Sequence, residues 1–172
     1  ERLFGKELRH QFLFGRGMAS DDTELACLTA QALLSSPTEV ARFARALAWG
    51  LRHWVVTLPA GVGLATLRAV LRLWTGMPPS RSGVRSAGNG PAVRAPVVGL
   101  AFWNDAGRLR EFARVCTRIT HTDARAERGA LAVALGARYA VTHHRCSFST
   151  EDLLALMRCA FVAKGPDPNA TN

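Results

Sequence analysis

Apolar residues recur along the chain with the spacing of amphipathic helices. The clearest stretch, 38–51, places them three and four residues apart, at Val40, Phe43, Ala44, Leu47 and Leu51. The same periodicity predicts helices over 23–35, 63–75, 91–103, 106–118 and 150–163, and another that starts near Asp123. No stretch alternates convincingly as a strand. The pattern therefore predicts an all-α domain of about seven helices.

Residues that favour helix ends support these limits. Thr38 is a candidate N-cap after Pro37, and Asp105 is one for the helix over 106–118. Gly76 fits the position just past a helix end. Pro96, inside the stretch 91–103, predicts a kink or a break.

The length and composition limit the class of protein. With 172 residues the chain is long enough for one domain with a core, which we expect over 1–164, followed by a disordered tail over 165–172. No run of about 18 apolar residues is uninterrupted, so no membrane helix is expected, and the first residues lack the apolar block of a secretory signal. The four scattered cysteines lack zinc-site spacing. We expect free thiols and a cytoplasmic location.

The net charge of +9 indicates an anionic partner. All but two of the 22 basic residues are arginines, and they are spread over the polar sides of the predicted helices. Neither a binding motif nor interleaved aromatic residues accompany them. Charge alone therefore does not favour nucleic acid as the partner.

The most informative short motif is Ser20-Asp21-Asp22-Thr23-Glu24, directly before an apolar helical run. These residues alone leave two interpretations open. Asp21 with Glu24 three residues later resembles a capping box. Alternatively, the adjacent carboxylates and the serine hydroxyl form a site for Mg²⁺ or Mn²⁺, since both ions prefer oxygen ligands and a cation would offset the repulsion between two aspartates.

Three further motifs lie near the ends of predicted helices. Gly61-Val62-Gly63 could let backbone amides approach a phosphate, although a plain turn is the commoner meaning. Gly88-Asn89-Gly90 precedes Pro91, and either forms a tight turn or binds a ligand. His121 lies between two predicted helices, where a structural or exposed histidine is commoner than a functional one.

The succession of these motifs resembles that of the ADP-ribosylglycohydrolase family. The resemblance covers about residues 15–140 and rests on three stretches in the right order: "SDDTEL", "GNGPAVRAPVVGLAF" and "RITHTDARA". It implies a multi-helix orthogonal bundle with a cleft that binds two divalent cations, Mg²⁺ or Mn²⁺. It also implies a hydrolase that removes ADP-ribose from modified protein side chains or from related ADP-ribosyl compounds.

The resemblance also implies roles for single residues. Ser20, Asp21 and Asp22 would be metal ligands, with serine in place of the family's usual threonine, and Asp21 and Asp22 would be catalytic. Gly61, Val62 and Gly63 would lie along the diphosphate. The rest of the ligand site would be lined by Gly88, Asn89, Gly90 and His121.

Two family features have no counterpart in the sequence. Family members are usually much longer, beginning with a Gly-Asp segment and ending with an Asp-x-Asp-Thr run that completes the metal site. The chain also starts without Met. We therefore expect a fragment or a shortened relative. The alternatives are an inactive ADP-ribose-binding or structural protein of the same fold and, less favoured, a basic helical module that binds nucleic acid.

Overall fold

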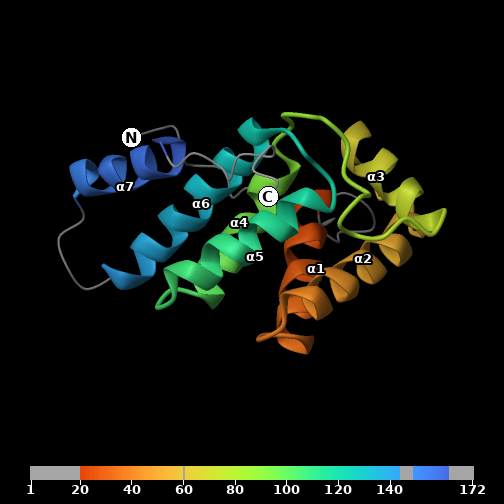
Figure 1. The fold of residues 1–172 in the computed structure, drawn as a ribbon, viewed down its shortest axis with the longest axis horizontal. Coiled ribbons are helices and arrows are strands. Elements are labelled where there is room, and N and C mark those ends of the chain that lie inside the picture. The colour runs from red at the N-terminus through yellow and green to blue at the C-terminus, as the bar shows by residue number, and fades with distance from the viewer. Residues whose placement is uncertain (1–19, 60, 144–148, 163–172) are drawn as a thin grey trace, which may run out of the picture.

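The computed structural model describes residues 20–59, 61–143 and 149–162, and these form seven α-helices (Figure 1). The helices are α1 (Asp21–Ser35), α2 (Val40–Val56), α3 (Leu64–Trp74), α4 (Gly90–Ala101), α5 (Ala106–Arg118), α6 (Ala124–Thr142) and α7 (Thr150–Val162). The prediction of an all-α domain is confirmed. The tail expected over 165–172 lies outside the described residues.

Most helix ends lie close to their predicted positions, with three differences. Asp105 caps α5 as expected, but Thr38 does not cap α2, because Glu39 stands at that position without a capping bond. Helix α2 also continues past the predicted end at 51, since Trp54 keeps the apolar face buried. Pro96 lies inside α4 without ending it. Tertiary packing of α4 outweighs the backbone hydrogen bond that proline removes.

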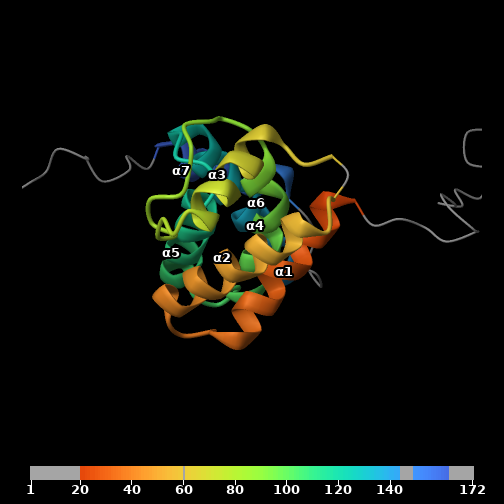
Figure 2. The ribbon, with the colours of Figure 1, turned by 90° about the vertical axis from the view of Figure 1, so that its right-hand side faces the viewer.

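Helix α4 lies at the centre of the molecule. It packs most extensively against α6 and also contacts α1 and α5, while α7 covers the outer side of α6 (Figures 1 and 2). A Cβ at Gly99 of α4 would lie only 2.9 Å from the carbonyl carbon of Ala134 in α6. The close approach of these two helices therefore depends on the missing side chain at Gly99.

Helix α3 stands at the other end of the molecule and packs mainly against α2 (Figure 1). Two long side chains add to this contact. Arg52 Nε donates to the carbonyl of Leu73 at 2.9 Å, and Arg72 donates to the carbonyl of Gly83 at 2.7 Å. The second bond ties α3 to the loop that leads into α4.

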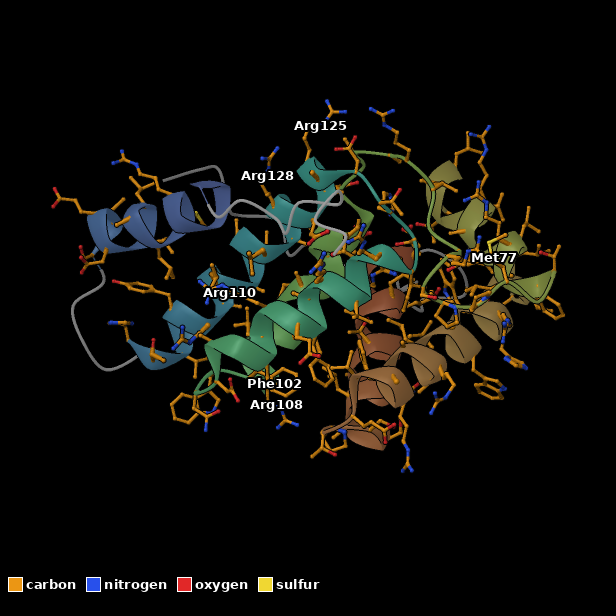
Figure 3. The ribbon with its side chains drawn as sticks, in the orientation of Figure 1. Met77, Phe102, Arg108, Arg110, Arg125 and Arg128 are labelled. Atoms are coloured by element: carbon orange, nitrogen blue, oxygen red, sulfur yellow. The ribbon has the colours of Figure 1, made fainter. Side chains whose placement is uncertain are left out.

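The core is built from the apolar faces that the periodicity predicted. Phe112 of α5 lies between Phe43 of α2 and Phe102, with ring centroids 5.2 Å and 4.4 Å apart. Most arginines lie on the surface, as Arg125 and Arg128 do in Figure 3. Within the described ranges, none of the helices combines the length and the apolar character needed to cross a bilayer.

Candidate functional site

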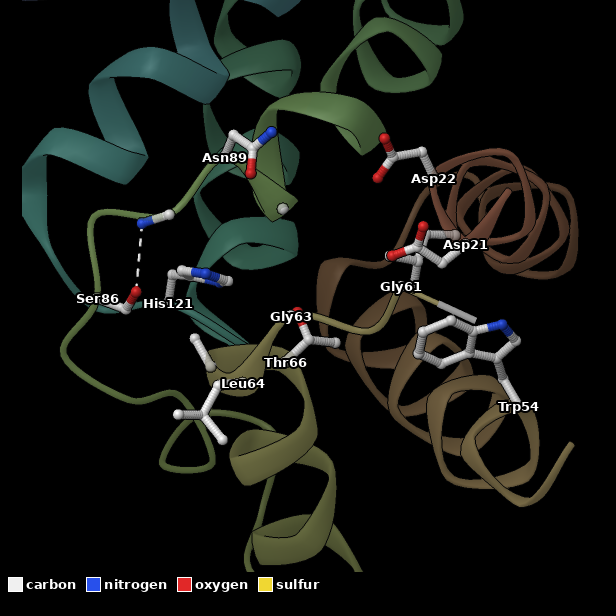
Figure 4. Close-up of a pocket in the computed structure, with 14 residues that line it drawn as sticks. Asp21, Asp22, Trp54, Gly61, Gly63, Leu64, Thr66, Ser86, Asn89 and His121 are labelled. Atoms are coloured by element: carbon white, nitrogen blue, oxygen red, sulfur yellow. Dashed lines mark hydrogen bonds between the residues drawn. The ribbon is translucent and has the colours of Figure 1, made fainter. Parts of the chain in front are cut away.

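A pocket of about 400 Å³ opens where the N-termini of three helices meet (Figure 4). Helix α1 contributes Asp21 and Asp22, α3 contributes its first turn, and α4 contributes Gly90 together with the preceding Asn89. The remaining polar lining comes from Ser86 and His121. Since a helix N-terminus carries a partial positive charge, three of them together favour a negatively charged occupant.

The first turn of α1 is capped by a residue other than the two aspartates. Ser20 is the N-cap, and its hydroxyl accepts the amide of Thr23 at 3.3 Å. The capping box between Asp21 and Glu24, one of the two interpretations that the sequence left open, is therefore not formed. Glu24 instead accepts the indole N–H of Trp54 at 2.7 Å. Asp21 and Asp22 therefore do not cap α1, although their charges suit the positive end of the helix dipole.

Both carboxylates of this turn line the pocket (Figure 4). Neither forms a hydrogen bond or an ion pair with another described residue. Gly61 approaches Asp21 so closely that a Cβ at this position would lie 3.0 Å from Oδ1, and its φ of +90° is one that side-chain-bearing residues rarely adopt. Glycine at position 61 thus leaves room for the Asp21 carboxylate.

His121 forms part of the opposite wall. A single β-bridge holds its segment in place, because the Thr122 amide donates to the Val84 carbonyl at 2.9 Å. The imidazole is only 3% exposed and faces two glycines. A Cβ at Gly88 would lie 3.1 Å from Nε2, and one at Gly90 would lie 3.2 Å from Cε1. Larger residues at either position would press against the ring.

A buried arginine lies behind His121. Arg94 of α4 donates through Nη2 to Thr120 Oγ1 at 2.6 Å and to the Cys116 carbonyl at 3.1 Å. Its Nε and Nη1 have no hydrogen-bond partner in the part of the chain that the structure describes. Burial, together with the nearby Arg94 charge, lowers the pKa of His121 to about 4. The imidazole is therefore neutral at pH 7.

Most residues singled out from the sequence come together here. The pocket is lined by Asp21, Asp22, Gly61, Gly63, Gly88, Asn89, Gly90 and His121. Two residues lie outside the lining. Ser20 is exposed and uses its hydroxyl as the cap of α1, and Val62 packs against the hydrophobic core.

The sequence did not reveal the six further lining residues: Leu25, Trp54, Leu64, Ala65, Thr66 and Ser86. The bond between Trp54 and Glu24 joins residues that are 30 positions apart, so no local pattern marks it. Thr66 could have been predicted to line the pocket, since it follows a candidate phosphate-binding turn and lies within the first turn of a helix. Ser86 accepts the amide of Gly88 at 3.2 Å and so shapes the loop before α4.

The donor set fits a divalent cation in part. Asp21 and Asp22 supply two carboxylates that lack a compensating cation, and carboxylate oxygen is the ligand that Mg²⁺ and Mn²⁺ prefer. Across residues 20–59, 61–143 and 149–162, no group of three or more His, Cys, Asp and Glu side chains gathers to hold a metal. These two aspartates would therefore form one side of a coordination shell.

Comparisons with known proteins place the chain in a family. A family model described as ADP-ribosylglycohydrolase matches residues 2–166. An uncharacterized protein of Archaeoglobus fulgidus is 30% identical over 139 residues, which make up 80% of this chain and 43% of that protein. The chain thus spans less than half the length of this relative.

Proposed function

The chain belongs to the ADP-ribosylglycohydrolase family, and we therefore propose that it hydrolyses the bond between ADP-ribose and a modified protein side chain. One observation carries this proposal: four segments far apart in the sequence bring two free carboxylates, two glycine turns and a histidine to the same pocket. In the reaction, water adds its hydroxyl to C1″ of the ribose. The side-chain atom that leaves C1″ receives the remaining proton.

The electrostatics of the pocket suit the diphosphate of ADP-ribose. Gly63 and the first turn of α3 line one part of the pocket, and Asn89 with the start of α4 lines another. Amides at such helix starts donate to phosphate oxygens, and the helix dipoles favour the negative charge. Asn89 forms no side-chain capping bond, so its amide group is available to a ligand.

A divalent cation completes this picture. Among the described residues, the charged side chains that line the pocket are those of Asp21 and Asp22, and both would repel an anionic ligand. Mg²⁺ or Mn²⁺ held by these carboxylates would remove the repulsion and, when bound, would polarise water and stabilise developing negative charge. The family resemblance suggests two such ions.

The other lining residues would bind and orient the ligand. Trp54 and Leu64 add apolar surface to the pocket lining, against which the uncharged parts of the ligand can pack. His121, neutral at pH 7, can hydrogen-bond to the ligand but is a poor proton acceptor there.

Release of ADP-ribose from an ADP-ribosylated protein, measured with Mg²⁺ or Mn²⁺ present, tests the proposal. We expect Asp21→Asn and Asp22→Asn to abolish release and to weaken Mn²⁺ binding in calorimetry. Glu151→Gln is the matched control, since this exposed acid lies in the first turn of α7, which contributes nothing to the pocket lining. Wild-type turnover in both aspartate variants would refute the assigned role.

A second candidate is an ADP-ribose-binding protein without hydrolytic activity. The observation that favours it is the partial donor set, because two carboxylates hold a cation weakly. Calorimetry with ADP-ribose, with and without Mg²⁺, separates the candidates. Binding that is insensitive to metal, without release of ADP-ribose from modified protein, would favour this second function.

A further inference from the structure

The hydroxyl of Thr120 contacts two buried polar groups at once. Arg94 Nη2 lies 2.6 Å from Thr120 Oγ1, and His121 Nδ1 lies 2.9 Å from the same oxygen. Arg94, Thr120 and His121 are 1%, 0% and 3% exposed. Bulk water therefore does not compete for these hydrogen bonds, and each polar hydrogen has few acceptors within reach.

The hydrogen of the Thr120 hydroxyl can be placed by elimination. A guanidinium has only donors, so Thr120 Oγ1 accepts from Arg94. The hydroxyl hydrogen then goes either to His121 Nδ1 or to the carbonyl of Thr117, which is 3.4 Å away. That carbonyl already accepts two backbone amides, at 3.1 Å and 2.9 Å, and 3.4 Å is long for an O–H···O bond. The hydroxyl therefore donates to Nδ1.

We propose that Thr120, held by Arg94, is a positioning residue that fixes His121 as the tautomer with its hydrogen on Nε2. In a neutral imidazole one nitrogen donates and the other accepts, so a donor on Thr120 leaves Nε2 as the N–H group. The Nε2 atom lies on the side of the ring that faces Gly88, at the pocket lining. Figure 4 shows the ring at this wall.

A fixed donor limits what the pocket accepts at this wall. The ligand atom next to Nε2 must carry a lone pair, as a hydroxyl or phosphate oxygen does, and an amine that can only donate is disfavoured. That the oxygen belongs to the ribose or the diphosphate of ADP-ribose rests on the proposed function. The tautomer itself does not. His121 also has no free acceptor nitrogen, and therefore positions the ligand and removes no proton from it.

Long-range ¹H–¹⁵N correlation spectra of the ligand-free, ¹⁵N-labelled chain test the tautomer directly. They distinguish a protonated from an unprotonated ring nitrogen, and His121→Asn identifies the signals among those of the five histidines. We expect Nε2 protonated and Nδ1 unprotonated. Thr120→Val keeps the shape but removes the hydroxyl, and should shift His121 toward a mixture of tautomers. Thr120→Ser should restore the wild-type spectrum.

Thr117→Val is the matched control. It makes the same change in the last turn of α5, where the hydroxyl bonds to the Ala113 carbonyl at 2.8 Å, and should leave the His121 signals unchanged. The proposal would be overturned if the wild-type chain carried the hydrogen on Nδ1. It would also be overturned if the His121 signals of Thr120→Val were the same as those of the wild-type chain. If Thr120→Val does not fold, the wild-type and Thr120→Ser spectra decide.

Calorimetry with ADP-ribose adds the functional readout. Loss of one oriented hydrogen bond should weaken binding to Thr120→Val about threefold to tenfold, while Thr117→Val binds as wild type does. Equal affinities for the two valine variants would contradict the positioning role. If ADP-ribose binds to none of the proteins, the proposed function fails, while the spectra of the free chain still establish the tautomer.

Discussion

Replacing Gly99 by alanine should weaken the packing at the centre of the molecule. The new Cβ would lie 2.9 Å from the carbonyl carbon of Ala134 and 3.1 Å from its Cα, and closer still to its carbonyl oxygen. Ordinary contact begins near 3.4 Å, so α4 and α6 would have to separate by about 0.5 Å or more. These are backbone atoms of a packed helix and cannot rotate away.

The expected magnitude follows from two opposing effects. Overpacking a core costs about 1–3 kcal/mol, and a clash with backbone belongs in the upper part of that range. Alanine regains about 1 kcal/mol of helix propensity over glycine. We therefore expect Gly99→Ala to lower the free energy of unfolding by about 1–2 kcal/mol.

Gly129→Ala is the matched control. It makes the same exchange inside α6, where a Cβ would meet no heavy atom within 4 Å. Only the propensity term remains there, so we expect stabilisation of up to about 1 kcal/mol. Thermal unfolding followed by circular dichroism should separate the two variants by roughly 2–12 °C, with about 2–4 °C per kcal/mol. A Gly99→Ala protein as stable as Gly129→Ala would refute the packing argument.

Three further outcomes are expected. Gly61→Ala should weaken Mn²⁺ binding in calorimetry, because its Cβ would press on Asp21 at 3.0 Å, whereas Gly63→Ala, with open space, should not. Asp105→Ala should lower the unfolding free energy in urea by about 1 kcal/mol, since it removes the cap of α5. Hydrogen bonds from the side chain and the backbone of Arg125 lower the pKa of Asp123 from 3.8 to about 2. The ionised Asp123 therefore stabilises the folded chain fully above pH 4, and this contribution declines as the pH falls toward 2. Asp123→Asn should flatten this part of the curve of unfolding free energy against pH.

The sequence allowed the fold to be predicted better than the site. Periodic apolar positions such as Phe43 and Leu47 identified the helices, because burial of one face repeats every three to four residues. The break that Pro96 allowed for is absent, because the free-energy cost of a proline inside a helix depends on how firmly the neighbouring helices hold α4. The start of α2 was predicted at Thr38, but Glu39 stands at the N-cap position. The residue that becomes a cap depends on backbone angles, which the capping preference of a residue type does not determine.

The site was only partly predictable. Asp21, Gly88 and His121 were identified because a family resemblance joined motifs that were weak by themselves, and periodicity alone would not have grouped them. The cap of α1 fell one residue earlier than the Asp21–Glu24 pattern suggested. The contact of Arg94 with Thr120 spans 26 residues, so the buried charge behind the histidine had no local signature.

The sparse support of α3 has a consequence for ligand entry. This helix supplies one rim of the pocket, yet α2 is the only helix of the described part of the chain against which it packs substantially. We expect a small tilt of α3 about that contact to widen the opening beside Asp21, while the loop at Gly83 follows α3 because Arg72 holds its carbonyl. Elements with few packed neighbours open at low free energy. An occupant that bridges α1 and α3 would act as a brace, so hydrogen exchange in α3 should slow more than in α4 when the pocket fills.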